Sequence, residues 1–143
     1  MNENLGYEPV TFIPPWNLAS KETKDALIKE GFRIYSGVRD EFEKTKLLTI
    51  GFTSATATFY PHTLVTLEKI KKECLESLER RNYCVIMIHP QDYLEEGWGE
   101  IDNPAIDLKK YKQFTSVVNF LLEQNLTFTT FRELHRLSLE NKF

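Results

Sequence analysis

Three histidines, His62, His89 and His135, are the residues of this chain best suited to proton transfer near neutral pH. No two of them have the spacing of a metal-ligand pair. His89 differs from the others because it follows an apolar run and directly precedes a proline. An imidazole held in this way could act as a general acid or base, although a histidine at a strand end is more often a hydrogen-bonded structural residue. We expect His62, at a helix start, and His135, on the last predicted helix, to face solvent.

The run before His89, from Tyr83 to Ile88, is apolar or aromatic throughout and carries no charge. It is too short for a buried helix and suits a strand that is covered on both faces. Helical patterns precede and follow it, so we predict the central strand of a parallel sheet. Pro90 has no N–H to continue a ladder, and the strand must end before it. Catalytic groups of α/β proteins lie at the C-terminal ends of parallel strands, which is where this pattern places His89.

The rest of the sequence alternates between strand-like and helix-like patterns. We predict strands at residues 9–14, 32–36, 47–52 and 126–129, and a further strand-like stretch at 53–60. Helices are predicted at 21–30, 61–81 and 109–124, and a last one begins after Thr130. This order favours an α/β fold, a mostly parallel sheet with alternating helices, in a single domain over residues 1–143.

Composition excludes several classes of protein. With 21 acidic and 18 basic residues the net charge is −3, which argues against non-specific nucleic-acid binding. No apolar run has the length of a membrane span. The first residues lack the pattern of a signal peptide, so we expect a cytoplasmic location if Met1 is the true start. Cys74 and Cys84 are expected to be free thiols, with a single bridge between them as the alternative.

Four stretches, in order, resemble the polysaccharide deacetylase (NodB-homology) family. Residues 10–17, Val-Thr-Phe-Ile-Pro-Pro-Trp-Asn, look like the proline-aromatic loop of its third motif. Residues 30–36 look like the turn after that motif, and residues 84–93, Cys-Val-Ile-Met-Ile-His-Pro-Gln-Asp-Tyr, look like the fifth motif. Residues 126–134 resemble the closing strand and helix of these domains. The ordered set spans nearly the whole chain and is more specific than any one of its motifs.

The resemblance implies part of a distorted (β/α) barrel and a metal-dependent hydrolase that removes acetyl groups from N- or O-acetylated carbohydrate. The implied cofactor is a divalent metal, usually zinc. By resemblance, His89 is the acid for the leaving amine, and Met87 lines the pocket for the acetate methyl group. Pro15 and Trp16 line the substrate groove. Trp98, in the long loop after His89, and Trp16 suit sugar stacking, although either could be an ordinary core aromatic.

The chain departs from the family pattern at its metal-binding end. The family's first motif, which supplies the base and one ligand, and its second, which supplies two histidine ligands, do not occur in this sequence. Ile13 stands where the third motif has an arginine. The matched stretches therefore correspond to the C-terminal part of such a domain, and no metal ligand is assigned within it. Two functions stay open: a deacetylase that needs an N-terminal metal-binding part, and a non-catalytic module that binds carbohydrate or a partner. Self-association, or a partner chain that completes the barrel, is also expected.

Overall fold

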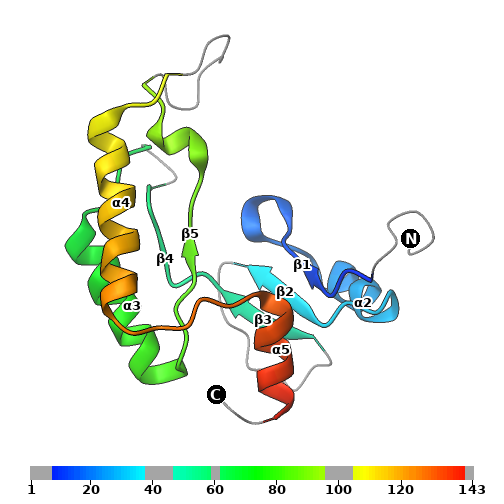
Figure 1. Ribbon diagram of the computed structural model, residues 1–143. Coiled ribbons are helices and arrows are strands. Elements are labelled where there is room, and N and C mark those ends of the chain that lie inside the picture. Colours follow the sequence, from blue (N-terminus) through cyan, green and yellow to red (C-terminus); the bar gives the residue numbers. More distant parts are fainter. Residues whose placement is uncertain (1–7, 38–46, 59–61, 96–104, 141–143) are drawn as a thin grey trace. The chain divides into compact units, whose positions relative to one another are not determined.

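The computed structural model of this chain describes residues 8–37, 47–58, 62–95 and 105–140 (Figure 1). The chain divides into two compact units, which we describe separately. Unit 1 comprises Met1–Phe52 and Phe128–Phe143, and unit 2 comprises Thr53–Thr127. Both combine parallel strands with helices, which confirms the expected α/β class and the parallel sheet with alternating helices. The sheets are small and open. The single domain over residues 1–143 stays a prediction.

Unit 1 is built on a three-stranded parallel sheet in the order β1-β2-β3. The strands are β1 (Thr11–Phe12), β2 (Ile34–Gly37) and β3 (Leu48–Gly51). Every residue of the middle strand β2 is buried, as expected for a strand paired on both edges. The core of this unit is apolar, because Leu27 and Phe32 pack with Tyr35 and Leu47. These residues come from the helix α2, from its connection to the sheet, and from the sheet itself.

Two helices of unit 1 begin at the caps that the sequence indicates. Helix α2 (Lys21–Lys29) follows Ser20, whose side chain accepts a hydrogen bond from the Thr23 backbone N–H at 3.3 Å. Helix α5 (Phe131–Leu139) follows Thr130, which accepts from the Glu133 N–H at 3.2 Å. Gly31 follows α2 with a φ of 91°, a left-handed conformation that glycine adopts at low cost.

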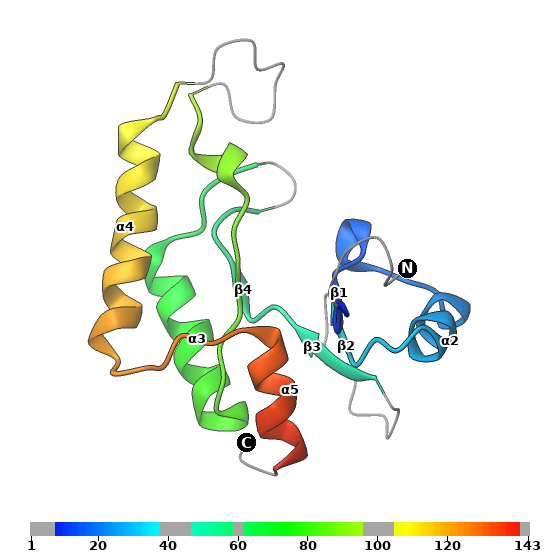
Figure 2. The same cartoon turned by 45° about the vertical axis from the view of Figure 1, so that its right-hand side comes forward.

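Unit 2 contains a smaller sheet, two long helices and a short 3-10 turn. Strands β4 (Ser54–Ala55) and β5 (Ile86–Met87) pair in parallel, Ser54 opposite Ile86 and Ala55 opposite Met87. Helices α3 (Leu67–Arg81) and α4 (Leu108–Glu123) lie side by side in both views (Figures 1 and 2). The turn η2 (Pro90–Tyr93) follows β5. Unit 2 thus supports its short strands mainly with helices.

A disulfide joins Cys74 of α3 to Cys84, just before β5, so the expectation of free thiols is wrong. The two Cα atoms are 5.3 Å apart, within the usual range for a disulfide. A buried hydroxyl reinforces this link: Ser77 Oγ donates to the Tyr83 carbonyl at 2.7 Å. Ser77 Oγ also lies within hydrogen-bond distance of Thr53 Oγ1, at 3.1 Å. The segment that leads into β5 is therefore held by one covalent bond and a small polar network.

The predicted strand at 83–88 is shorter than expected and is not central. Only Ile86 and Met87 form the ladder with β4, and a two-stranded sheet has no central strand. Before them, the Thr53 side chain accepts from the Val85 N–H at 3.1 Å, where a ladder bond would otherwise form. After them, Ile88 is 40% exposed, so the strand is not covered on both faces. An apolar run sets the propensity for a strand, but partners and coverage come from the tertiary fold.

Two other predictions are wrong, namely the strand at residues 126–129 and the helix start at residue 61. Residues 126–129 form no strand, and Phe128 is 63% exposed, because this stretch connects α4 to α5 and pairs with no described strand. Helix α3 begins at Leu67, later than the predicted start at residue 61. Thr66 is its N-cap and accepts from the Lys69 N–H at 3.4 Å. Before this cap the chain is not helical: the Val65 N–H donates to the Thr56 carbonyl at 2.9 Å, so Val65 lies beside the residue that follows β4.

Candidate functional site

His89 lies just past the C-terminal end of β5, in unit 2. Its backbone is extended, with φ −111° and ψ 118°, and Pro90 opens the turn η2 directly after it. The His89 carbonyl accepts the Asp92 N–H at 3.0 Å, so the turn folds back on the histidine. The imidazole belongs to a half-buried residue. Pro90 therefore keeps the His89 backbone extended and opens η2, whereas the ladder of β5 already ends at Met87.

The partner strand brings a buried threonine to the same end of the sheet. Thr56 follows β4 and is completely buried. Its N–H donates to the Met87 carbonyl at 3.0 Å, which extends the pairing of β4 and β5 by one bond. Met87, the residue that the family resemblance assigns to the acetate pocket, is half-buried at this position. Sequence reasoning did not single out Thr56, because only the pairing of the two strands shows its place.

The turn η2 carries two buried polar side chains next to His89. Asp92 is 8% exposed and Tyr93 is 6% exposed. The Tyr93 hydroxyl donates to Gln113 Oε1 at 3.2 Å, and Gln113 Nε2 in turn donates to the Val65 carbonyl at 2.7 Å. Burial raises the pKa of Tyr93, and the nearby charge of Asp92 adds to that rise. The phenol therefore stays protonated at neutral pH and acts as a donor that joins η2 to α4.

Two buried side-chain oxygens of unit 2, Ser54 Oγ and Gln91 Oε1, make no hydrogen bond within the described residues. Buried polar atoms in proteins almost always have a partner, so such atoms mark places where a ligand or a water can bind. Gln91 comes two residues after His89 in the same turn. A histidine that can move a proton and an amide oxygen that can accept a hydrogen bond therefore lie close in sequence beyond β5. No sequence signal distinguished Gln91 from an ordinary loop residue.

Pro15 and Trp16 belong to unit 1, in the 3-10 turn η1 (Pro15–Asn17) after β1. Trp16 and Asn17 both have left-handed backbone conformations, with φ of 58° and 56°. Non-glycine residues rarely adopt this conformation, and it persists where surrounding contacts impose it. One contact is visible: the Tyr35 hydroxyl donates to the Asn17 carbonyl at 3.3 Å. Trp16 itself is 74% exposed and is not a core residue.

Gly37 of β2 allows this approach. A Cβ atom there would lie 3.1 Å from the Asn17 carbonyl oxygen and 2.5 Å from Tyr35 Cε1. The absence of a side chain at Gly37 thus gives room both to the ring of Tyr35 and to the turn that presents Trp16. The exposed indole is therefore supported from the sheet of unit 1.

Pro15, Trp16, Ser36 and His89 each stand at or just past the end of a strand predicted from the sequence, so we expect them to gather at one rim of a parallel sheet. This stays a prediction, because His89 lies in unit 2 and the other three in unit 1. Trp98, the other predicted sugar-stacking residue, lies outside the described residues. Among residues 8–37, 47–58, 62–95 and 105–140, no group of three or more His, Cys, Asp or Glu side chains could hold a metal ion. The zinc that the family resemblance implies therefore stays an expectation, with no ligand for it assigned in this chain.

No protein-family model, no curated protein and no solved structure matches this chain significantly. The likeness to polysaccharide deacetylases accordingly rests on the four sequence stretches named above. In the described part of the chain, no helix combines the length and the apolar character needed to cross a membrane.

Proposed function

We propose that this chain is polysaccharide deacetylase-like and takes part in removing acetyl groups from N- or O-acetylated carbohydrate. In this proposal it forms the C-terminal part of a distorted (β/α) barrel, and the reaction needs the metal-binding N-terminal part. The observation that supports it best is the placement of His89 just beyond a parallel strand, with Pro90 after it. That is the position at which α/β enzymes carry catalytic side chains.

His89 and Met87 would have different roles at the acetyl group. His89 would give a proton to the nitrogen of the leaving amine, which leaves more readily as a neutral amine than as an anion. Met87 would contact the acetate methyl group.

A second function, a non-catalytic module that binds carbohydrate or a partner, is favoured by the surface around η1. Trp16 is 74% exposed there, and its neighbours Ile13 and Leu18 are 59% and 70% exposed. An indole fixed by the backbone and open to solvent suits the apolar C–H face of a sugar ring, and stacking on it needs no metal. In this proposal the chain binds carbohydrate as members of the family do, but it does not catalyse deacetylation.

Acetate release tests the first function. The substrate is an N-acetylated chito-oligosaccharide with added zinc, and the protein is the longest form that its native source makes. We expect His89→Gln to lower the rate about 10²- to 10⁴-fold, which is the usual contribution of a general acid. His62→Gln is the matched control, since His62 is an exposed histidine of the same unit, and it should leave the rate unchanged.

Sugar binding separates the module from the enzyme. Binding that is lost in Trp16→Ala, with no acetate released by any form of the protein, would establish the module and reject the enzyme. Acetate release with equal rates for the His89→Gln and His62→Gln variants would reject the role of His89. A protein that neither binds the acetylated sugar nor releases acetate would contradict both functions.

A further inference from the structure

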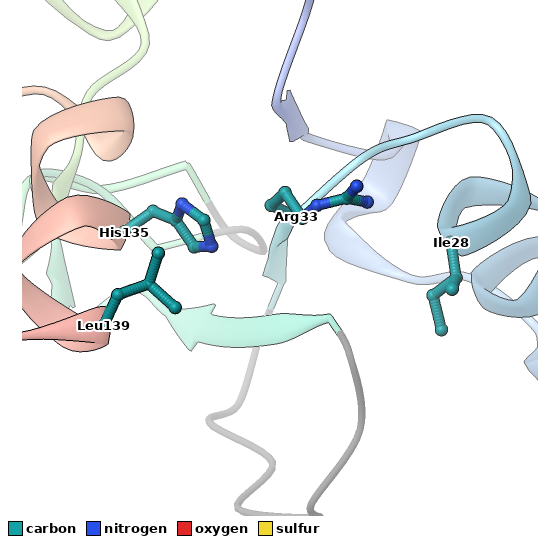
Figure 3. Close-up of a pocket in the computed structure, with 4 residues that line it drawn as sticks. All are labelled: Ile28, Arg33, His135 and Leu139. Atoms are coloured by element: carbon teal, nitrogen blue, oxygen red, sulfur yellow. The ribbon is translucent and has the colours of Figure 1, made fainter.

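A hollow of about 430 Å³ lies in unit 1 and contains none of the residues proposed above to contact carbohydrate (Figure 3). It is lined by two apolar and two basic side chains: Ile28 of α2, Arg33 just before β2, and His135 and Leu139 of α5. Figure 3 shows His135 and Leu139 projecting from α5 and Ile28 from α2, with Arg33 between them in this view. Its volume is within the range of small-molecule sites.

The backbone fixes the position of Arg33. Its N–H donates to the Val10 carbonyl at 2.9 Å, and its carbonyl accepts the Leu48 N–H at 2.8 Å. Arg33 is thus held from both neighbouring strands of the sheet, although its side chain is exposed. Nη1 donates to the Phe32 carbonyl at 3.0 Å, which directs the guanidinium. Because a guanidinium has five N–H donors, most of them stay available for a ligand.

The charge of Arg33 is not neutralised by a described residue, since none of them forms an ion pair with it. On α5, the acids Glu133 and Glu140 pair instead with Arg136. The hollow therefore combines an uncompensated guanidinium and an imidazole with two aliphatic side chains. The basic groups suit an anion, and the aliphatic groups suit a hydrocarbon chain.

Helix α5 forms one side of the hollow, and contacts within unit 1 hold this helix in place. Arg132 Nη2 donates to the Glu8 carbonyl at 2.8 Å, and Leu134 is buried. His135 is half-buried next to Leu134, and Leu139 follows one turn later on the same face. These contacts keep the imidazole and the aliphatic side chain of α5 together at the hollow.

We propose that this hollow binds a small monocarboxylate with a short apolar tail. Arg33 receives the carboxylate, for which the planar guanidinium offers paired, parallel hydrogen bonds. His135 adds a donor from the opposite side, and the tail lies between Ile28 and Leu139. An inorganic anion such as phosphate would satisfy only the basic half of this lining. The proposal does not rest on the proposed deacetylase-like function.

Two sources offer this chemistry, a short-chain fatty acid and the C-terminal residue of a peptide. The test is a ¹H–¹⁵N NMR titration of the 143-residue chain with hexanoate, hexanamide, phosphate and N-acetylleucine. We expect hexanoate to shift the signals of Arg33 and His135 with a dissociation constant on the order of a millimolar. Hexanamide and phosphate should bind at least about tenfold more weakly. Tighter binding of N-acetylleucine than of hexanoate would identify a peptide C-terminus as the source.

Variants test the assignment of the residues. Arg33→Gln should weaken hexanoate binding about tenfold, because it removes the charged hydrogen bonds. Lys29→Gln is the matched control: it removes the same charge from the exposed end of α2, outside the lining, and should change binding less than about twofold. Leu139→Ser should reduce hexanoate binding to the level of acetate. Equal binding of hexanoate and hexanamide, or equal effects of Arg33→Gln and Lys29→Gln, would overturn the proposal.

Discussion

The two units hold their parallel strands together in different ways. In unit 1, β2 lies between two strands, all its residues are buried, and the core beside it is apolar. In unit 2, β4 and β5 pair over two residues each and are half-buried at most of their positions. A disulfide and hydrogen bonds from Ser77, Thr53 and Gln113 support them. Apolar burial therefore supports the strands of unit 1 directly. In unit 2, residues such as Ile70, Val117 and Phe120 are buried on the helices, and cross-links tie the short strands to those helices.

The candidate site lies on the cross-linked sheet. Strand β5 is only two residues long and half-buried, and His89 beyond it is half-buried as well and keeps access to solvent. The same shortness leaves β5 with few ladder bonds to fix its position. The disulfide before β5 and the turn η2 after it supply that fixation. The comparison predicts different responses to substitution in the two units.

The largest effect is expected in the sheet of unit 1. Ile34 in β2 is completely buried, and Ile34→Ala should lower the free energy of unfolding by about 4 kcal/mol through lost burial and a residual cavity. Ile13→Ala is the control, since Ile13 is 59% exposed, and should cost less than about 0.5 kcal/mol. Urea unfolding followed by circular dichroism measures both. Similar small losses for the two variants would show that apolar burial does not hold this sheet.

Loss of the disulfide in unit 2 should have the second largest effect. Replacing both Cys74 and Cys84 with alanine should lower the free energy of unfolding by about 3 kcal/mol, because the unfolded chain is then no longer closed between them. A reducing agent should have a similar effect on the unsubstituted protein and none on the double variant. Mass spectrometry of unreduced peptides should find the two cysteines linked. Two free thiols in protein purified without reductant would contradict the claim that a disulfide supports unit 2.

The polar network of unit 2 should contribute less than the disulfide. Gln113 donates to the Thr56 and Val65 carbonyls and accepts from Tyr93, so Gln113→Ala removes three side-chain hydrogen bonds that α4 makes to other elements. We expect a loss of about 2 kcal/mol in urea unfolding. The control is Gln124→Ala, since the Gln124 side chain makes only a long bond to the Phe120 carbonyl of its own helix. Equal effects of the two substitutions would mean that Gln113 does not join α4 to the sheet.

The smallest effects are expected at the helix caps, where the two units should not differ. Thr130→Ala in unit 1 and Thr66→Ala in unit 2 each remove a side-chain oxygen that accepts a backbone N–H at a helix start. Each should cost about 1 kcal/mol of unfolding free energy. Because a cap acts within its own helix, these two losses of unfolding free energy are a reference for the larger losses predicted above. A much larger loss at only one cap would show a tertiary role for that threonine.

The helices were more predictable than the strands, because their signals are local. Helix α2 begins at residue 21 and α5 directly after Thr130, as predicted, and α2 and α4 end within one residue of the predicted positions. The stretch at 126–129 has a β-rich pattern but no strand to pair with, and the run at 83–88 pairs only in part. A strand needs a partner, and its sequence does not name one. The disulfide was only the alternative to free thiols, because the packing of α3 beside the segment before β5 decides whether Cys74 and Cys84 can meet.

One part of the candidate site was predictable from the sequence, namely the backbone conformation of His89, because the proline after it restricts that conformation. Pro90 restricts the His89 backbone to an extended conformation through the covalent chain alone, whereas the end of β5 at Met87 depends on its pairing with β4. Thr56 and Gln91 could not be singled out, because strand pairing places the first and burial distinguishes the second. The left-handed turn at Trp16 likewise depends on its contact with Tyr35 from another element.

The most direct test of the account concerns His89 itself. The imidazole signals of His62, His89 and His135 are followed by NMR while the chain is titrated with an N-acetylated chito-oligosaccharide, and again with its deacetylated form. The account predicts that the His89 signal moves with the acetylated sugar, moves less with the deacetylated one, and that the other two histidines stay in place. A His89 signal that does not move, or three histidines that move alike, would contradict a carbohydrate site at the end of β5.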